Sequence, residues 1–390
     1  MILLDLTHTS HTRARTGIQR VCRSLRDALQ RSEPLTCVCH DPYLRAWRSL
    51  QGWEEENLVN DQAEAGRGAR WPLRAKLSGH GARWLQRRGP DLPAADLLLV
   101  PEVFSAAVAG ALPELEAHVH GPRVAVFHDA IALKFPELSP VKTVARFPAY
   151  LHELARFDGV AAVSDDSREC LLDFWRWAGV SQPPPVMTHA LGLDAPGTAA
   201  DGATPADGGK PTLLCVGSLE GRKNHLALLE ACEALWAQGR VFRLHLIGLA
   251  HAQTGRAALQ RVRTLQAAGR PLTYDGPVDE AHLLAAYRAC TFTVYPSLIE
   301  GFGLPVLESL SHGKPCVCSG HGALGESARG GGCLTVDPLT PETLADAIDR
   351  LLQSPAERAR LAAEAHARVF KTWDAYARDL VAWARTLKRR

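Results

Sequence analysis

The chain has 390 residues, which is longer than a single hydrophobic core usually grows, so two domains are expected. Its 44 Lys and Arg against 42 Asp and Glu give a net charge of +2, which argues against a dedicated nucleic-acid binder. The N-terminal segment turns polar at Asp5, too early for a signal peptide, and no apolar run approaches the roughly 20 residues of a membrane-spanning helix. These features predict a soluble, cytoplasmic enzyme.

The first half of the chain alternates apolar, strand-like runs with helical stretches. Strands are predicted at 2–6, 97–100, 124–127 and 159–163, and a helix at 18–30. Such alternation is typical of βαβ units and a mostly parallel sheet.

The composition changes at residues 194–211, which are Gly, Pro, Ala and Asp with no apolar periodicity, so we expect an exposed interdomain linker. A second alternating series follows it. Its predicted strands are 212–217, 242–248 and 291–295, and its predicted helices are 225–238, 255–268, 282–290, 341–352 and 373–387.

The ten cysteines include no Cys-x-x-Cys pair and no metal-ligand spacing. Two pairs, Cys37 with Cys39 and Cys316 with Cys318, are two residues apart in apparent strands, so each pair should share a sheet face. We expect reduced, buried thiols, as in other cytoplasmic proteins.

Residues 300–308 read Glu-Gly-Phe-Gly-Leu-Pro-Val-Leu-Glu and follow the predicted strand 291–295. Gly301 and Gly303 allow a tight turn and a close approach to a ligand, and Pro305 suits the start of a helix. The backbone N–H groups at this helix start would point at an anion. The residues expected to donate them are Phe302, Gly303 and Leu304.

Two carboxylates, Glu300 and Glu308, flank this predicted anion-binding turn. A nucleotide-sugar has matching parts, because its diphosphate suits the N–H groups while its sugar and ribose hydroxyls suit the carboxylates. The sequence therefore predicts a nucleotide-sugar site after strand 291–295.

Transfer from a nucleotide-sugar requires that charge on the departing diphosphate be stabilised. The sequence has no Asp-x-Asp metal motif, and Asp165-Asp166 has the pattern of a helix N-terminus. Arg222 and Lys223 follow the predicted strand 212–217, at the edge where open α/β sheets bind ligands. We therefore expect a metal-free site with no cofactor, in which these two cations bind the diphosphate.

The segment from Glu300 to Glu308 closely resembles the Glu-x7-Glu motif of family 4 retaining glycosyltransferases. Further matches run through the second domain and are fewer in the first; they are 216–224, 275–278 with the following Leu-x-x-x-Tyr helix, 324–326, 336–338, 16–20 and 127–129. The resemblance implies the GT-B fold, an α/β architecture of two Rossmann-like domains with parallel sheets that face each other across a cleft. The implied domains are 1–193 on the acceptor side, the linker 194–211, 212–372 for the nucleotide-sugar, and a C-terminal helix at 373–390 that packs back on the first domain.

The resemblance also implies roles for individual residues. Glu300 would bind sugar hydroxyls and stabilise positive charge at the anomeric carbon, and Glu308 would bind the ribose. His128 would line the cleft beside the transferred sugar, next to Asp129 at the donor. Gly17 would let the donor phosphates approach the first domain. The implied mechanism is front-face substitution, in which the leaving phosphate takes the proton of the acceptor.

The segment Thr-Gly-Ile-Gln-Arg-Val at 16–21 resembles that of O-antigen mannosyltransferases, so GDP-mannose is the first expected donor and a lipid-linked bacterial surface glycan the expected acceptor. Two alternatives are a nucleotide-sugar 2-epimerase of the same architecture and a non-catalytic glycan-assembly subunit. Residues 65–90 contain seven Lys or Arg, Trp71, Trp84 and no acidic residue. This composition suits peripheral contact with the inner membrane as well as a solvated loop.

Overall fold

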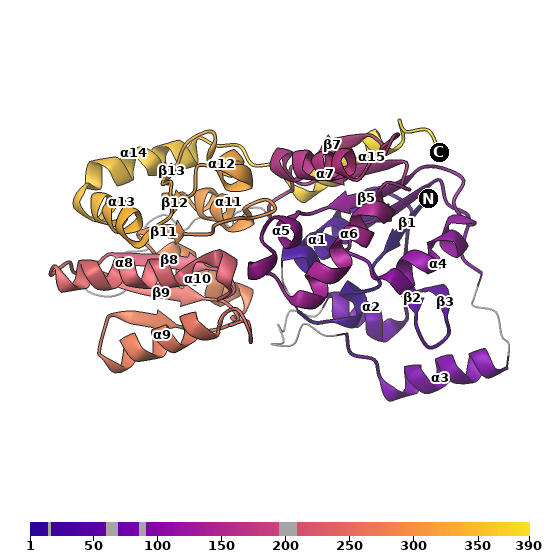
Figure 1. Cartoon of the computed structure of the whole chain (residues 1–390), viewed down its shortest axis with the longest axis horizontal. Helices are drawn as coiled ribbons and strands as arrows, with labels where there is room; N and C mark the ends of the chain where they lie inside the picture. The colour runs from indigo at the N-terminus through magenta and orange to yellow at the C-terminus, as the bar shows by residue number, and fades with distance from the viewer. Residues whose placement is uncertain (15–16, 60–68, 86–90, 195–208) are drawn as a thin grey trace. The chain divides into compact units, whose positions relative to one another are not determined.

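A computed structural model of the chain describes residues 1–14, 17–59, 69–85, 91–194 and 209–390. They divide into two compact α/β units, which confirms the predicted two-domain fold class (Figure 1). Unit 1 comprises Met1–Leu133, Val141–Gly192 and Lys371–Arg390, and unit 2 comprises Lys134–Pro140 and Leu193–Phe370. Most of the predicted linker, residues 195–208, lies outside the described residues.

The described part of unit 1 is built on a seven-stranded sheet of order β3-β2-β1-β4-β5-β6-β7. All neighbouring strands are parallel except β2 and β3, so an antiparallel strand forms one edge. The strands are β1 (Ile2–Asp5), β2 (Leu35–Asp41), β3 (Ala46–Ser49), β4 (Leu97–Val100), β5 (Arg123–Phe127), β6 (Gly159–Ala162) and β7 (Val186–Thr188). The four residues of β4, all aliphatic, are buried, as expected for a strand covered on both faces.

Helices cover this sheet, and the C-terminal helix α15 packs on α1. Their packing is reinforced at the surface, where Arg31 Nε donates to Asp374 Oδ1 at 3.0 Å and Arg385 pairs with Glu33 at 2.8 Å. The helices of this half and the C-terminus are α1 (Gly17–Ser32), α2 (Gly52–Val59), α3 (Leu73–Trp84), α4 (Ala106–Glu116), α5 (Ile131–Lys134), α6 (Val141–Leu154), α7 (Asp165–Trp177) and α15 (Trp373–Ala384), with short 3-10 turns at Thr9–His11 and Pro136–Leu138. Asp165 and Asp166 form the first turn of α7, and Ser164 caps it.

Two buried carboxylates lie at the carboxyl ends of β1 and β4, the neighbouring strands at which the strand order of this sheet reverses: Asp5 is the last residue of β1, and Glu102 follows β4. Glu102 accepts the backbone N–H groups of His8 and Thr9, both at 2.6 Å. Burial, and then the negative charge of Glu102, raise the pKa of Asp5 to about 7.

Unit 2 contains a six-stranded parallel sheet of order β10-β9-β8-β11-β12-β13 within the described residues. Its strands are β8 (Thr212–Val216), β9 (Arg243–Ile247), β10 (Leu272–Tyr274), β11 (Phe292–Tyr295), β12 (Cys316–Cys318) and β13 (Cys333–Thr335). Its helices are α8 (His225–Ala237), α9 (Arg256–Ala267), α10 (Glu280–Ala289), α11 (Leu304–Ser311), α12 (Gly322–Ala328), α13 (Pro341–Gln353) and α14 (Pro355–His366). The strand order reverses between β8 and β11, and ligands bind outside the carboxyl ends of strands at such a point.

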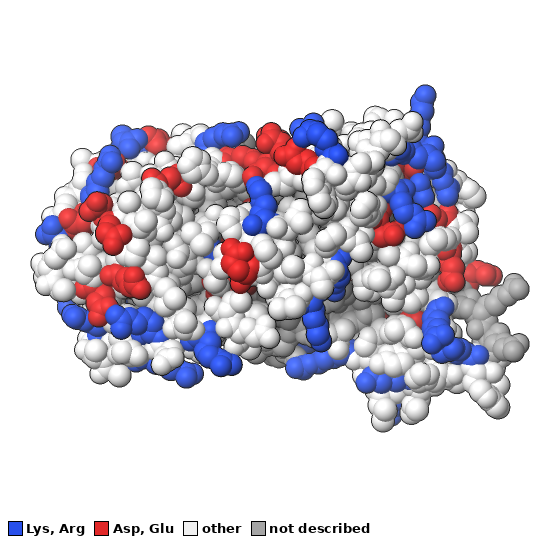
Figure 2. Space-filling view, in the orientation of Figure 1, with Lys and Arg blue, Asp and Glu red and all other residues white. Residues whose placement is uncertain are grey.

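Several general predictions can be compared with the structure. All ten cysteines are free thiols, and eight of them are buried, including Cys316 and Cys318 on β12. No helix among the described residues is both long and apolar enough to cross a membrane. Lys and Arg are interspersed with Asp and Glu over the visible face (Figure 2).

Candidate active site

The loops that follow β8 and β11 meet at the point where the strand order of unit 2 reverses. A short 3-10 turn, Gly221–Lys223, follows β8 and ends at Asn224, whose φ of 52° is left-handed. The backbone N–H of Leu298, in the loop after β11, donates to the carbonyl of Arg222 at 2.8 Å. This hydrogen bond joins the two loops, so their side chains are held close together.

The side chains of Arg222 and Lys223 both pair with Glu300. Arg222 Nη1 lies 2.6 Å from Glu300 Oε2, and Lys223 Nζ contacts Oε1. The side chain of Arg222 is 22% exposed, that of Lys223 12% and that of Glu300 10%, so the two ion pairs are largely shielded from water. Burial alone would raise the pKa of Glu300, but the Arg222 and Lys223 charges lower it to about 2. The structure thus brings Glu300, predicted to bind the sugar, together with Arg222 and Lys223, both predicted to bind the diphosphate.

Gly303 occupies the turn that starts α11 and has a φ of 98°, which favours glycine. A Cβ atom added there would lie 2.9 Å from Ser327 Oγ, so the space is also closed to a side chain. Ser327 Oγ in turn donates to the carbonyl of Phe302 at 2.6 Å. Pro305 lies in the first turn, as the sequence predicted, and α11 has no side-chain cap among the described residues. The positive end of the α11 dipole therefore lies at this turn.

Glu308 lies one turn further along α11, where a pair of tyrosines positions it. Tyr287 Oη, from α10, donates to Glu308 Oε2 at 3.1 Å, and it lies 3.0 Å from Tyr295 Oη at the end of β11. Both tyrosines are buried. Sequence reasoning gave neither of them a role, although Tyr287 belongs to the Leu-x-x-x-Tyr helix that carries part of the resemblance.

The remaining predicted site residues lie in unit 1. His128 follows β5, is 6% exposed, and places Nε2 2.7 Å from the carbonyl oxygen of Pro101. A carbonyl only accepts, so Nε2 carries the proton, and burial lowers the pKa of this histidine, which favours the neutral ring. Asp129 Oδ1 accepts the N–H of Ile131 at 3.0 Å and so opens α5. Gly17 is the first residue of α1, and a Cβ atom added to it would meet nothing within 4 Å.

The chain is similar in sequence to known glycosyltransferases. Residues 198–368 match the family model "Glycosyl transferases group 1". O-antigen chain mannosyltransferase B of Escherichia coli is 30% identical over 305 residues, which cover 73% of this chain and 77% of that protein. The serotype-specific mannosyltransferase WbdA of Escherichia coli is 24% identical over 339 residues; these cover 81% of this chain but only 38% of WbdA, so the chain spans well under half of that relative.

Two solved structures share the fold over the full length of the chain. Sucrose-phosphate synthase from Thermosynechococcus elongatus superposes with a TM-score of 0.69 at 22% identity, over 99% of this chain and 98% of that one. HepE of Anabaena, in complex with UDP and glucose, superposes with a TM-score of 0.67 at 15% identity, over 99% of both chains. The fold is therefore GT-B, and the chain belongs to the group 1 family of glycosyltransferases.

Proposed function

We propose that the protein is a retaining glycosyltransferase that moves a hexose from a nucleotide-sugar to a growing, lipid-linked surface glycan without using a metal ion. The observation that carries this proposal is the convergence of Arg222 and Lys223 on Glu300 at the switch point of the unit 2 sheet. Two cations at this edge suit a diphosphate, and a carboxylate between them suits the sugar attached to it.

In the proposed step, the bond between the anomeric carbon and the β-phosphate oxygen breaks while the acceptor oxygen attacks from the same face. The acceptor hydroxyl gives its proton to the departing phosphate oxygen, and attack from the face that the phosphate leaves retains the configuration. Arg222 and Lys223 stabilise the charge that develops on the diphosphate. Glu300, ionised across the physiological range, binds sugar hydroxyls and stabilises positive charge at the anomeric carbon.

The turn before α11 and the helix itself supply the rest of the proposed donor site. The backbone of Gly301, Phe302, Gly303 and Leu304 faces the phosphates, where the helix dipole favours an anion. The carboxylate of Glu308, oriented by the hydrogen bond from Tyr287, accepts hydrogen bonds from the ribose hydroxyls. For His128, Asp129 and Gly17, a role at the donor rests on the family resemblance.

The relatives favour a particular sugar and acceptor. Two of them are named as mannosyltransferases, and one of these acts on an O-antigen chain by its name. We therefore propose GDP-mannose as the first donor to be tested and a surface polysaccharide as the product.

Contact with the inner membrane is proposed for α3, which lies inside the predicted segment 65–90; residues 65–68 and 86–90 lie outside the described residues. Three apolar side chains of α3 are exposed: Leu73 at 71%, Leu77 at 63% and Trp84 at 84%. Their spacing of four and seven residues places them on one face of the helix.

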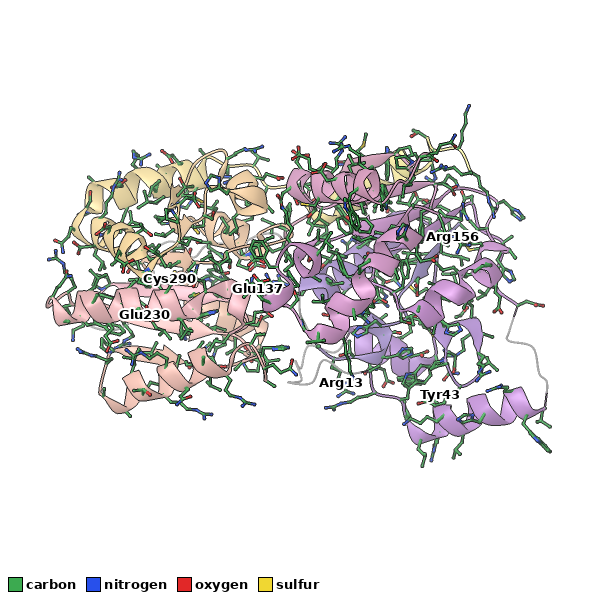
Figure 3. All side chains as sticks on the ribbon, viewed as in Figure 1. Arg13, Tyr43, Glu137, Arg156, Glu230 and Cys290 are labelled. Carbon is green, nitrogen blue, oxygen red and sulfur yellow. The ribbon has the colours of Figure 1, made fainter. Side chains whose placement is uncertain are left out.

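Basic residues flank this apolar face of α3, and the opposite face packs on the rest of unit 1. Arg70, Arg74, Lys76 and Arg83 lie in or beside α3, and residues 69–85 contain no Asp or Glu. The opposite face is held at Gly79, where an added Cβ atom would lie 2.8 Å from the side chain of Tyr43, a residue beside α3 (Figure 3). Lys and Arg are seen with uncharged residues over α3 (Figure 2). An exposed apolar stripe flanked by cations suits an anionic lipid surface.

The proposal is tested by a thermal-shift screen against GDP-, UDP-, dTDP- and CMP-sugars, followed by NMR of the product formed with the stabilising donor. A retaining transferase releases a nucleoside diphosphate, or CMP from a CMP-sugar, and forms an α-linked sugar from an α-linked donor. A product with inverted configuration would refute retention. A 2-epimerised sugar without transfer would support the isomerase, and no stabilisation by any donor would support a non-catalytic subunit.

A further inference from the structure

Two histidines and one aspartate converge on the surface of unit 2, two strands away from the loop that bears Glu300. His245 Nε2 lies 2.6 Å from Asp275 Oδ2, and His282 Nε2 lies 3.0 Å from the same oxygen. The three ligand atoms all lie within 4.8 Å of one another. The side chains are 17%, 26% and 51% exposed, in the order His245, Asp275, His282, so the group is accessible from solvent.

Each of the three residues is held by the backbone of a different element. His245 lies in the middle of β9, paired with both β8 and β10. Asp275 follows β10, and its N–H donates to the carbonyl of Leu246 at 3.1 Å. His282 lies in the first turn of α10, where its N–H donates to the capping carboxylate of Asp279 at 2.8 Å. Two of the three residues therefore lie in regular elements, and a backbone hydrogen bond to β9 holds the third, Asp275, in the loop after β10.

We propose that His245, Asp275 and His282 bind a divalent transition-metal ion of the zinc class. Imidazole nitrogen and carboxylate oxygen are the ligands that zinc, nickel and copper prefer. Bond lengths of about 2.0–2.2 Å to zinc place ligand atoms roughly 3.3–3.5 Å apart in a tetrahedral site. The two histidine–carboxylate separations, 2.6 and 3.0 Å, would need to widen by less than about 1 Å.

Metal binding changes which ring nitrogen carries the proton in each histidine. Without the ion, each neutral imidazole can donate its Nε2–H to the carboxylate; with it, Nε2 binds the metal and the proton resides on Nδ1. One aspartate and two neutral histidines leave a net charge of +1 on the metal centre, which a partly exposed position tolerates. The three protein ligands leave at least one position for water.

Two other groups of possible ligands among the described residues suit such an ion less well. They are Cys316 with Cys318 and Cys333, and His11 with Cys39 and Glu54. Burial raises the pKa of Cys316 well above its ordinary value, whereas hydrogen bonds from Cys316 and Cys318 lower the pKa of Cys333 to about 5, so one thiolate of the three is favoured without an ion. Glu54 already accepts from Arg48 Nη1 at 2.6 Å and from Nη2 at 2.8 Å, so its oxygens are occupied.

An ion in the His245, Asp275 and His282 site would tie α10 to the middle of β9 and to the loop after β10. The same helix carries Tyr287, which orients Glu308. The ion would thus act as a structural clamp on a helix that supports the donor site, and it takes no part in the proposed transfer step.

The test uses the full chain without a histidine tag, stripped with chelator and then dialysed. Calorimetry and thermal shift with Zn²⁺ should show one ion that raises the melting temperature. His245→Ala and His282→Ala should each weaken its binding by about tenfold or more, since loss of even an outer-shell partner costs that much. The matched control is His321→Ala: His321 Nε2 lies 3.6 Å from Asp337 Oδ2, but this His–Asp pair lacks a third ligand among the described residues. The control should bind Zn²⁺ like the wild type.

Three outcomes would overturn the proposal: no Zn²⁺ binding by the wild type, equal binding by the wild type and both site variants, or a Co²⁺ spectrum with the thiolate charge-transfer band that assigns the ion to cysteines. All measurements are made without a nucleotide-sugar, so failure here leaves the proposed transferase function untouched, and a failed donor screen leaves the metal site untouched.

Discussion

Replacement of Glu300 by glutamine should separate nucleotide binding from catalysis. In the structure, Glu300 pairs with the same two cations, Arg222 and Lys223, that are proposed to bind the diphosphate. Lowering its pKa from 4.5 to about 2 corresponds to about 3 kcal/mol of stabilisation of the ionised form. Part of this interaction must be given up or shared when a diphosphate arrives.

Glu300→Gln removes the carboxylate that competes with the diphosphate for Arg222 and Lys223. It also removes the negative charge that stabilises positive charge at the anomeric carbon. The affinity for free nucleoside diphosphate should therefore stay the same or increase. The increase is at most about 150-fold, which corresponds to the same 3 kcal/mol. Turnover should fall by about tenfold to 150-fold, the effect of losing one charge-assisted hydrogen bond of about 1.5–3 kcal/mol.

Calorimetry with nucleoside diphosphate and steady-state assays of donor turnover, both near neutral pH, measure the two effects. Glu220→Gln serves as the control, because Glu220 pairs with Arg222 at 2.8 Å and its loss should lower turnover less. If Glu300→Gln abolishes nucleotide binding while Glu308→Gln leaves it unchanged, the proposed roles of the two glutamates are reversed.

The remaining predictions concern four other features. Lys223→Ala should reduce turnover by more than about tenfold, because it removes a charge-assisted contact to phosphate, and wild-type turnover should require neither magnesium nor manganese; inhibition by EDTA that magnesium or manganese reverses would refute metal-free transfer. Glu308→Gln should weaken nucleotide binding in calorimetry, since an amide accepts a poorer hydrogen bond from ribose than a carboxylate does. Trp84→Ala should reduce sedimentation with anionic liposomes, whereas Trp177→Ala, which removes a tryptophan of nearly equal exposure (83% against 84%), should not; equal effects would return α3 to a solvated helix. Because the pKa of Asp5 is raised to about 7, its contribution to the free energy of unfolding decreases as pH rises from 4 to 7. In urea titrations, the free energy of unfolding of Asp5→Asn relative to wild type should therefore be higher at pH 8 than at pH 5; an unchanged difference would contradict the raised pKa.

Much of the fold follows from local sequence patterns. Alternating apolar runs predicted β1, β4, β5, β6, β8, β9 and β11 to within about two residues, because a buried parallel strand is a short apolar run bounded by turn residues. Leu344, Ile348 and Leu351 recur at the spacing of three to four residues that places apolar side chains on one face of a helix, and this pattern predicted α13. The short strands β7, β10 and β13, of three residues each, are too brief to give such a pattern.

The loop from Glu300 to Glu308 could likewise be read from the sequence, because its glycines, proline and carboxylates act through local backbone geometry. Gly303 in a left-handed turn before α11 is an example. The sequence also identified Arg222 and Lys223 as cations at the same edge of the sheet.

Only the tertiary structure decided which of these residues touch. The pairing of Glu300 with Arg222 and Lys223 joins positions 78 and 77 residues apart, and it depends on β8 and β11 being neighbours in the sheet. The contact of Tyr287 with Glu308 and the convergence of His245, Asp275 and His282 depend equally on where α10 packs. Strand order and helix packing are set by burial of apolar surface over the whole domain, so no local pattern of residues encodes these contacts.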